Sequence, residues 1–154
     1  MSDLRKAFWN TMCEIAEQDK DVILITGDLG YSFDSEYIKR FPKQYLNAGC
    51  IEQSMIGISA GMALGGKKPY VYSGSIFLIG RAFEQVRDDI AYNGLNVKLC
   101  GTGASGFLGF THNWQGTENE EDLLKNLPIE RYYPKDEEEL TKALLSDNGA
   151  FIRI

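Results

Sequence analysis

Short apolar stretches with strand character alternate with helical stretches along the whole chain. Residues 22–26 form a uniformly apolar run typical of a buried strand, and the apolar residues before it recur at helical intervals from Leu4 to Ile15. Further strands are predicted at 44–46, 69–73, 97–101, 129–133 and 150–154, and further helices at 33–41, 52–65, 77–92, 118–126 and 136–147. This alternation predicts an α/β fold, a mainly parallel sheet of about six strands with helices on both faces.

Length and composition restrict the classes of function. The 154 residues fit a single domain, expected to span 1–154. A net charge of −6 offers no electrostatic footprint for nucleic acid or an anionic membrane, so neither is expected as a partner. Cys13, Cys50 and Cys100 are too widely spaced to suggest a disulfide framework or a zinc site. No run reaches membrane-spanning length, and we expect a cytoplasmic protein.

Glu52 stands at the entrance of a predicted helix whose later residues are apolar or very small. An ionised glutamate is almost never buried unless it has a partner. One interpretation is a solvated first-turn residue that complements the helix dipole. The other is a buried carboxylate with a functional role.

Several chemically versatile residues follow the predicted strands. Ligands of such sheets bind outside the carboxyl ends of the strands. The residues at these ends are, in chain order, Asp28, Glu52, Tyr72, Phe77 and His112. Each has a structural explanation too: a turn cap for Asp28, core packing for Phe77, and a structural hydrogen bond for His112, the only histidine. Their coincidence at strand ends, with a long Gly-rich loop predicted over 102–117, favours a functional site.

Six short motifs extend over nearly the whole chain. They are Thr26-Gly-Asp-Leu29, Asn47-Ala-Gly-Cys-Ile-Glu-Gln53, Pro69-Tyr-Val-Tyr-Ser73, Phe77-Leu-Ile-Gly-Arg-Ala-Phe-Glu-Gln85, Gly109-Phe-Thr-His112 and Leu127-Pro128. In order and spacing they resemble the pyrimidine-binding domain of transketolase and 1-deoxyxylulose-5-phosphate synthase, which are thiamine-diphosphate enzymes.

The resemblance implies roles for individual residues. The glutamate matching Glu52 hydrogen-bonds N1′ of the aminopyrimidine ring of thiamine diphosphate, the aromatic residue matching Phe77 stacks on that ring, and the histidine matching His112 faces the substrate. Glu52 and His112 are therefore the expected catalytic residues. A carboxylate on N1′ drives the 4′-amino group of the cofactor towards its imino form, more effectively where water is excluded. Further cofactor contacts are expected from Asp28, Tyr72 and Arg81.

A diphosphate-binding motif is missing from these residues. In the family, a separate domain holds the diphosphate and its divalent metal through a Gly-Asp-Gly opening followed by an Asn ligand. Gly27-Asp28-Leu29 lacks the third glycine, and Asn47 precedes the next predicted helix. The resemblance thus implies one subunit of a split enzyme, expected to form a heterotetramer. A partner subunit would hold the diphosphate and Mg²⁺ or Ca²⁺, and the pyrimidine domains would associate with each other. No metal ligand is expected in this chain.

The expected substrate contacts match the family only in part. Arg5 and Ser32 match an Arg and a Ser with which transketolases bind a sugar phosphate. A family histidine corresponds to Cys100 or its neighbours, and a family aspartate corresponds to Leu108. Because the phosphate clamp is incomplete, the sugar is open to being unphosphorylated, differently phosphorylated or nucleotide-linked. Trp114 either stacks on the sugar or closes the loop.

The resulting prediction is a transketolase-like transferase that moves a two-carbon ketol unit between sugars and is active only with its partner. Two alternatives remain. A subunit of a two-chain 2-oxoacid decarboxylase would use the same glutamate, although the Phe-Leu and Thr-His motifs argue against it. A noncatalytic interaction domain would not need Glu52, Phe77 and His112. The acidic runs 118–122 and 136–139 are expected in solvated first turns of helices, without a metal.

Overall fold

The computed structural model describes residues 4–103 and 119–154. Its strands form one six-stranded sheet in the order β2-β1-β3-β4-β6-β5, and all neighbouring strands are parallel. The strands are β1 (Val22–Thr26), β2 (Tyr45–Asn47), β3 (Lys68–Gly74), β4 (Lys98–Thr102), β5 (Glu130–Tyr132) and β6 (Ala150–Arg153). The predicted α/β class and strand number are confirmed.

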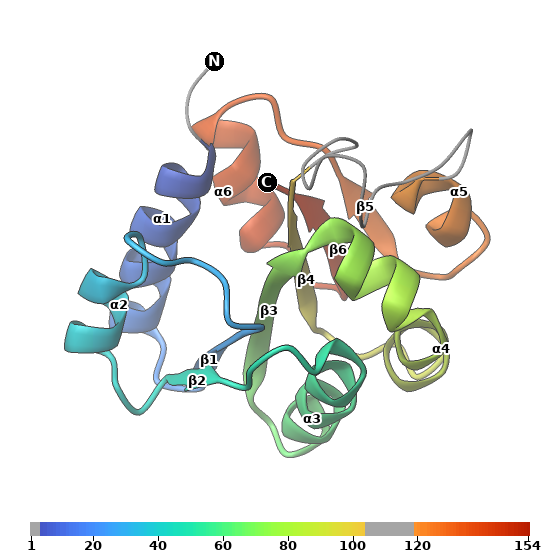
Figure 1. The fold of residues 1–154 in the computed structure, drawn as a ribbon, viewed down its shortest axis with the longest axis horizontal. Coiled ribbons are helices and arrows are strands. Elements are labelled where there is room, and N and C mark those ends of the chain that lie inside the picture. The colour runs from blue at the N-terminus through green and yellow to red at the C-terminus, as the bar shows by residue number, and fades with distance from the viewer. Residues whose placement is uncertain (1–3, 104–118) are drawn as a thin grey trace.

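Helices cover both faces of the sheet, as predicted. Figure 1 shows α1, α2 and α6 on one side and α3, α4 and α5 on the other. The helices are α1 (Leu4–Gln18), α2 (Ser35–Arg40), α3 (Glu52–Leu64), α4 (Phe83–Gln85), α5 (Glu120–Leu124) and α6 (Glu137–Leu144), with the π-helical segments η1 (Ile76–Arg81) and η2 (Val86–Ala91) on either side of α4. Within ranges 4–103 and 119–154, no helix is long and apolar enough to cross a membrane.

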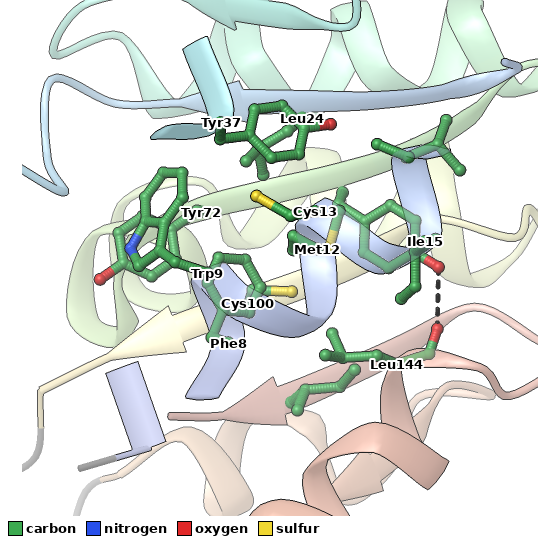
Figure 2. Close-up of a cluster of buried hydrophobic side chains, with 14 of the residues drawn as sticks. Phe8, Trp9, Met12, Cys13, Ile15, Leu24, Tyr37, Tyr72, Cys100 and Leu144 are labelled. Carbon is green, nitrogen blue, oxygen red and sulfur yellow. Dashed lines mark hydrogen bonds between the residues drawn. The ribbon is translucent and has the colours of Figure 1, made fainter. Parts of the chain in front are cut away.

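Two hydrophobic cores lie on opposite faces of the sheet because successive strand residues point to opposite sides. On β3, Tyr72 belongs to the core under α1, whereas Val71 belongs to the core under α3. Figure 2 shows the α1-side core, where the Phe8 ring stacks on Tyr72 with centroids 5.0 Å apart. The alternation decides which strand residues can reach a site on the α3 side.

The region predicted as one helix over 77–92 is divided. The π-helical segments η1 and η2 enclose a single short α-helical stretch, α4. A π-helix pairs each residue with the fifth along the chain, so its turn is wider than that of an α-helix. Apolar spacing indicates that a segment is helical but does not distinguish these two windings. Single π-helical turns occur frequently at functional sites, and η1 carries Phe77 and Arg81.

The strand order reverses direction at β1, which lies between β2 and β3. From β1 the chain passes through α2 to β2 on one side, and then through α3 to β3 on the other. Thr26 ends β1 in register with Asn47 on β2 and Tyr72 on β3. Such a reversal opens a crevice at the carboxyl ends of the strands, where ligands bind.

One acidic residue departs from the expectation of solvated first turns. Glu120, at the start of α5, is only 2% exposed and pairs with Arg153 at the end of β6. Because a buried carboxylate needs a counter-charge, this pair fixes the start of α5 to the carboxyl edge of the sheet. The run 136–139 matches the expectation, since its residues are exposed and Asp136 caps α6 through the Glu139 amide.

Candidate functional site

Glu52 is buried at the start of α3, with 2% of its surface exposed. The Ser73 hydroxyl donates a hydrogen bond to Oε1 at 3.1 Å, and Arg81 Nη1 donates to Oε2 at 2.6 Å. The interpretation of a solvated first-turn residue is therefore wrong. The carboxylate has a counter-charge, as the general rule for buried glutamate requires.

The turn between β2 and α3 brings the Glu52 side chain to the carboxyl edge. The Asn47 side-chain oxygen accepts a hydrogen bond from the Gly49 amide at 3.0 Å, which closes a tight turn directly after β2. Gly49 has a φ of +80°, in the left-handed region that favours glycine. The helix then begins at Glu52, where the positive end of the helix dipole faces the carboxylate.

Ser73 reaches Glu52 because it points to the α3 side of the sheet, whereas its neighbour Tyr72 points to the α1 side. A Cβ atom on Gly27 would lie 2.9 Å from Ser73 Oγ and 3.2 Å from the Met55 sulfur. The absence of a side chain at Gly27 thus allows Ser73 and α3 to pack closely. Ser73 is not among the residues selected from the sequence, although strand alternation in 69–73 was the signal that could have identified its direction.

Phe77 and Arg81 come from η1, four residues apart, and contact each other. The Arg81 guanidinium carbon lies 4.5 Å from the centroid of the half-buried Phe77 ring. A Cβ atom on Gly74 would lie 3.0 Å from this ring, so the ring is close to the end of β3. Arg81 therefore contacts the Glu52 carboxylate and the Phe77 face at the same time.

The Glu52–Arg81 pair predicts a measurable coupling in the stability of the chain. Arg81→Ala removes the counter-charge of a buried carboxylate and is expected to lower the free energy of unfolding by about 1.5–3 kcal/mol. This range lies below the value for a fully buried pair because the Arg81 side chain is 40% exposed. In a Glu52→Gln background the same substitution should cost less than half as much. Urea unfolding of the four proteins measures this difference, and equal costs in both backgrounds would show that the pair contributes nothing.

Tyr72 is not brought together with Glu52. Its ring is buried in the α1-side core against Phe8 and Trp9, on the other face of the sheet. Burial raises the pKa of the Tyr72 hydroxyl. The Tyr72 side chain therefore points away from Glu52, into the core on the opposite face of the sheet.

Asp28 lies two residues after the end of β1, at the predicted strand end. Its Oδ1 accepts hydrogen bonds from the Tyr31 hydroxyl at 2.6 Å and from the Asn47 amide at 3.2 Å. These two bonds hold the pKa of Asp28 below its ordinary value. Its φ of +58° is unusual for a residue other than glycine, and such backbone conformations occur preferentially at functional sites.

Arg5 lies near the segment that contains Ser32. The Arg5 guanidinium carbon lies 5.6 Å from the centroid of the Phe33 ring, and Phe33 directly follows Ser32. Ser32 is exposed and has a φ of +76°. Arg5 is exposed as well. Arg5 thus lies beside the loop after β1, which contains both Ser32 and Asp28.

The predictions for His112, Leu108 and Trp114 lie outside the described residues. Within the described ranges, no group of three or more His, Cys, Asp or Glu side chains is arranged to hold a metal ion. What the described residues provide is a buried, hydrogen-bonded carboxylate beside a flat aromatic face, suited to a planar group that carries N–H donors.

Comparison with known proteins agrees with this arrangement. Residues 1–147 match the family model of the transketolase pyrimidine-binding domain. The chain is 42% identical over 113 residues to one subunit of the apulose-4-phosphate transketolase of Phocaeicola vulgatus, covering 71% of this chain and 36% of that protein. It is 31% identical over 160 aligned residues to a 6-deoxy-6-sulfo-D-fructose transketolase subunit of a Clostridium species, covering 98% and 49%.

A solved structure shows the same fold. A split-gene transketolase, described as an inactive beta4 tetramer, superimposes with a TM-score of 0.82 at 30% identity, covering 97% of this chain and 50% of that one. The chain belongs to the family of transketolase pyrimidine-binding domains. It spans half or less of the length of each of these three proteins.

Proposed function

We propose that this chain is the pyrimidine-binding part of a thiamine-diphosphate-dependent transketolase that transfers a two-carbon ketol unit between sugars. The observation that carries this proposal is the buried Glu52 carboxylate beside the Phe77 ring, in a chain of the transketolase family. The same family membership supports ketol transfer over the alternatives of a 2-oxoacid decarboxylase subunit and a noncatalytic domain.

The residues present fit the aminopyrimidine ring of the cofactor. The Arg81 guanidinium is planar, carries N–H donors, hydrogen-bonds Glu52 Oε2 and lies over Phe77. A flat aminopyrimidine needs these same two contacts. Glu52 would accept the hydrogen bond from N1′ and share its proton, and Phe77 would support the face of the ring. When the ring binds, the Arg81 guanidinium would leave Glu52 Oε2 and remain at the edge of the site. From that edge Arg81 would make the cofactor contact that we assign to it.

The other two residues expected to contact the cofactor differ in their support. Asp28 lies after β1 at the same edge as Glu52, and it is an anionic acceptor whose pKa the bonds from Tyr31 and Asn47 lower further. Tyr72 would act only indirectly, by supporting β3 from the opposite face. Once bound, the cofactor supplies the carbon nucleophile for cleavage of the carbon–carbon bond. The protein positions the cofactor and adjusts its protonation.

We assign the diphosphate and its Mg²⁺ or Ca²⁺ to a diphosphate-binding domain on a partner subunit. The support is that residues 1–154 lack the Gly-Asp-Gly motif and that the two transketolase relatives are named as subunits. Self-association of the pyrimidine domains, within a heterotetramer, is supported by exposed apolar residues of α3, with Leu64 75% and Ile58 39% exposed. We also place the protein in the cytoplasm, which agrees with its three free cysteines.

The substrate that we propose is a ketose with an anionic end. The relatives are named for apulose 4-phosphate and 6-deoxy-6-sulfo-D-fructose, which carry a phosphate and a sulfonate. Arg5, which is exposed and lies near the Phe33 ring, is the cation that we assign to this group. His112 is the residue that we assign to the hydroxyl of the donor sugar. Its segment is flanked at the carboxyl edge by Gly103, directly after β4, and by Glu120, which pairs with the end of β6.

A reconstitution experiment tests the function. The chain alone, supplied with thiamine diphosphate and Mg²⁺, is expected to show no acceleration of proton–deuterium exchange at the cofactor C2 atom and no ketol transfer. Adding the transketolase subunit that co-purifies with the native chain should produce both, measured by NMR and with a panel of ketoses and 2-oxoacids.

Three results would contradict parts of this proposal. Full activity of the isolated chain would remove the need for a partner. Release of CO₂ from a 2-oxoacid without ketol transfer would identify a decarboxylase. Absence of any turnover in the native complex would favour a noncatalytic domain.

A further inference from the structure

A cavity of about 510 Å³ opens at the amino ends of β1, β3 and β4. It lies between α1 and the end of α6, and polar side chains form much of its wall, among them Thr11, Glu14, Lys68, Lys98, Thr141 and Asp147. From Lys68 to Ser73, β3 advances five residues, so the cavity is about 17 Å from the Glu52 edge at roughly 3.3 Å per residue. The proposed cofactor site does not account for it.

Lys98 is the unusual member of this wall. Only 2% of the Lys98 surface is exposed. Its Nζ donates hydrogen bonds to the Asn148 carbonyl at 2.5 Å and to the Asn96 side-chain oxygen. Both acceptors are uncharged. Among the described residues, Lys98 forms no salt bridge with a carboxylate. A buried ammonium without a counter-ion is costly, so the environment shifts the protonation equilibrium of Lys98 towards the neutral amine.

Desolvation lowers the pKa of Lys98 to about 8, and the more distant carboxylates of Asp147 and Glu130 oppose this shift. At pH 7.4 about one fifth of such an amine is neutral, against roughly 0.1% of an ordinary lysine. A desolvated lysine with a free amine is the form that attacks carbonyl compounds. The neutral amine of Lys98 can therefore react with a carbonyl compound whose charge and size allow it to enter the cavity.

Charged groups from each surrounding element restrict that reagent. Glu14 faces the cavity from α1, Asp19 from the turn after α1 and Asp147 from the turn after α6. Lys68 on β3 is neutralised by Asp19, at 2.5 Å. The wall is thus acidic overall, which disfavours anions and admits neutral polar molecules.

Cys100 lies two residues further along β4 and is fully buried. Burial raises the pKa of this thiol far above neutral, so it stays protonated and does not compete with the amine as a nucleophile.

We propose that Lys98 is a carbonyl-reactive lysine that forms an imine with small neutral hydroxyaldehydes. The amine nitrogen attacks the aldehyde carbon, the carbonyl oxygen leaves as water, and a carbon–nitrogen double bond replaces the carbon–oxygen double bond. The two hydrogens of the neutral amine leave with that oxygen. The step needs no oxidant or reductant.

The test uses the full chain with glycolaldehyde and sodium cyanoborohydride, which reduces imines to stable amines. Peptide mass spectrometry then gives the initial labelling rate of each lysine between pH 6 and pH 9. At pH 7, Lys98 is expected to be labelled about 10–100-fold faster than the exposed Lys125 and Lys142, since its larger neutral fraction outweighs its restricted access. Its rate should level off above pH 8, whereas theirs should continue to rise.

Controls separate reactivity from exposure. Glyoxylate, an anionic aldehyde, should label Lys98 more slowly than glycolaldehyde relative to Lys142, because the cavity wall is acidic. Lys98→Arg should remove the fast-labelled site, with folding checked by circular dichroism, and the comparison among lysines of the unmodified chain needs no variant. Labelling of Lys98 no faster than Lys142, or only in urea, would overturn the proposal. Cofactor exchange at the Glu52 site is not involved, so this result is independent of the proposed function.

Discussion

Replacing Glu52 with glutamine is expected to slow proton–deuterium exchange at the C2 atom of thiamine diphosphate by on the order of 10²–10⁴-fold in the assembled complex. Glutamine keeps the volume of the side chain and can still accept the Ser73 hydrogen bond, but it cannot share a proton with N1′. Turnover should fall with the exchange rate. NMR of quenched samples measures the exchange directly, without knowledge of the sugar substrate.

The matched control is Glu84→Gln on α4, which makes the same chemical change at an exposed position. This variant should exchange at the unmodified rate. Sedimentation should show that both variants assemble with the partner, because Glu52 lies inside the domain. Exchange in Glu52→Gln as fast as in the unmodified complex would show that the carboxylate does not activate the cofactor.

His112→Ala is expected to lower turnover by about 10²–10⁴-fold while leaving the affinity for thiamine diphosphate nearly unchanged. Histidine is the side chain whose unperturbed pKa lies near neutral pH, and His112 is the only one in the sequence. In the proposed function it bonds a donor hydroxyl and assists proton transfer during cleavage. Measuring kcat together with the cofactor Kd separates this role from a structural one.

Asn113→Ala, next to His112, serves as a control for general disturbance of the segment. It should retain most of the turnover. If His112→Ala instead weakens cofactor binding or unfolds the domain without a specific loss of kcat, the histidine is structural. The transketolase-like assignment would then lose its clearest substrate-facing residue.

The sheet was predictable because its central strands are buried on both faces. In the strand over 22–26 the first four residues are apolar, and the helices around it carry apolar residues at regular intervals. The observed ends of the elements differ from the predicted ends by one to a few residues, because helix ends depend on tertiary contacts. For example, the helix predicted over 136–147 ends at Leu144. The winding of η1 was not predictable from apolar spacing.

The candidate site was predictable in its position but not in its contacts. Glu52 and Phe77 were found because they follow strand ends, and this rule holds for any sheet of this type. The same rule also selected Tyr72, whose side chain points to the opposite face. The pairing of Glu52 with Arg81 joins residues 29 positions apart and depends on how α3 packs against η1, which periodicity does not encode.

The counter-charge of Glu52 comes from its own chain, and this affects the stability of the chain before assembly. If only a cofactor or a partner could neutralise this buried carboxylate, the folded state of every newly made chain would be destabilised. With Arg81 Nη1 at 2.6 Å from its Oε2, the Glu52 carboxylate has a counter-charge within the chain itself, before any cofactor or partner binds. In the proposed two-subunit enzyme, surplus copies of this chain are therefore expected to resist proteolysis until a partner subunit binds them.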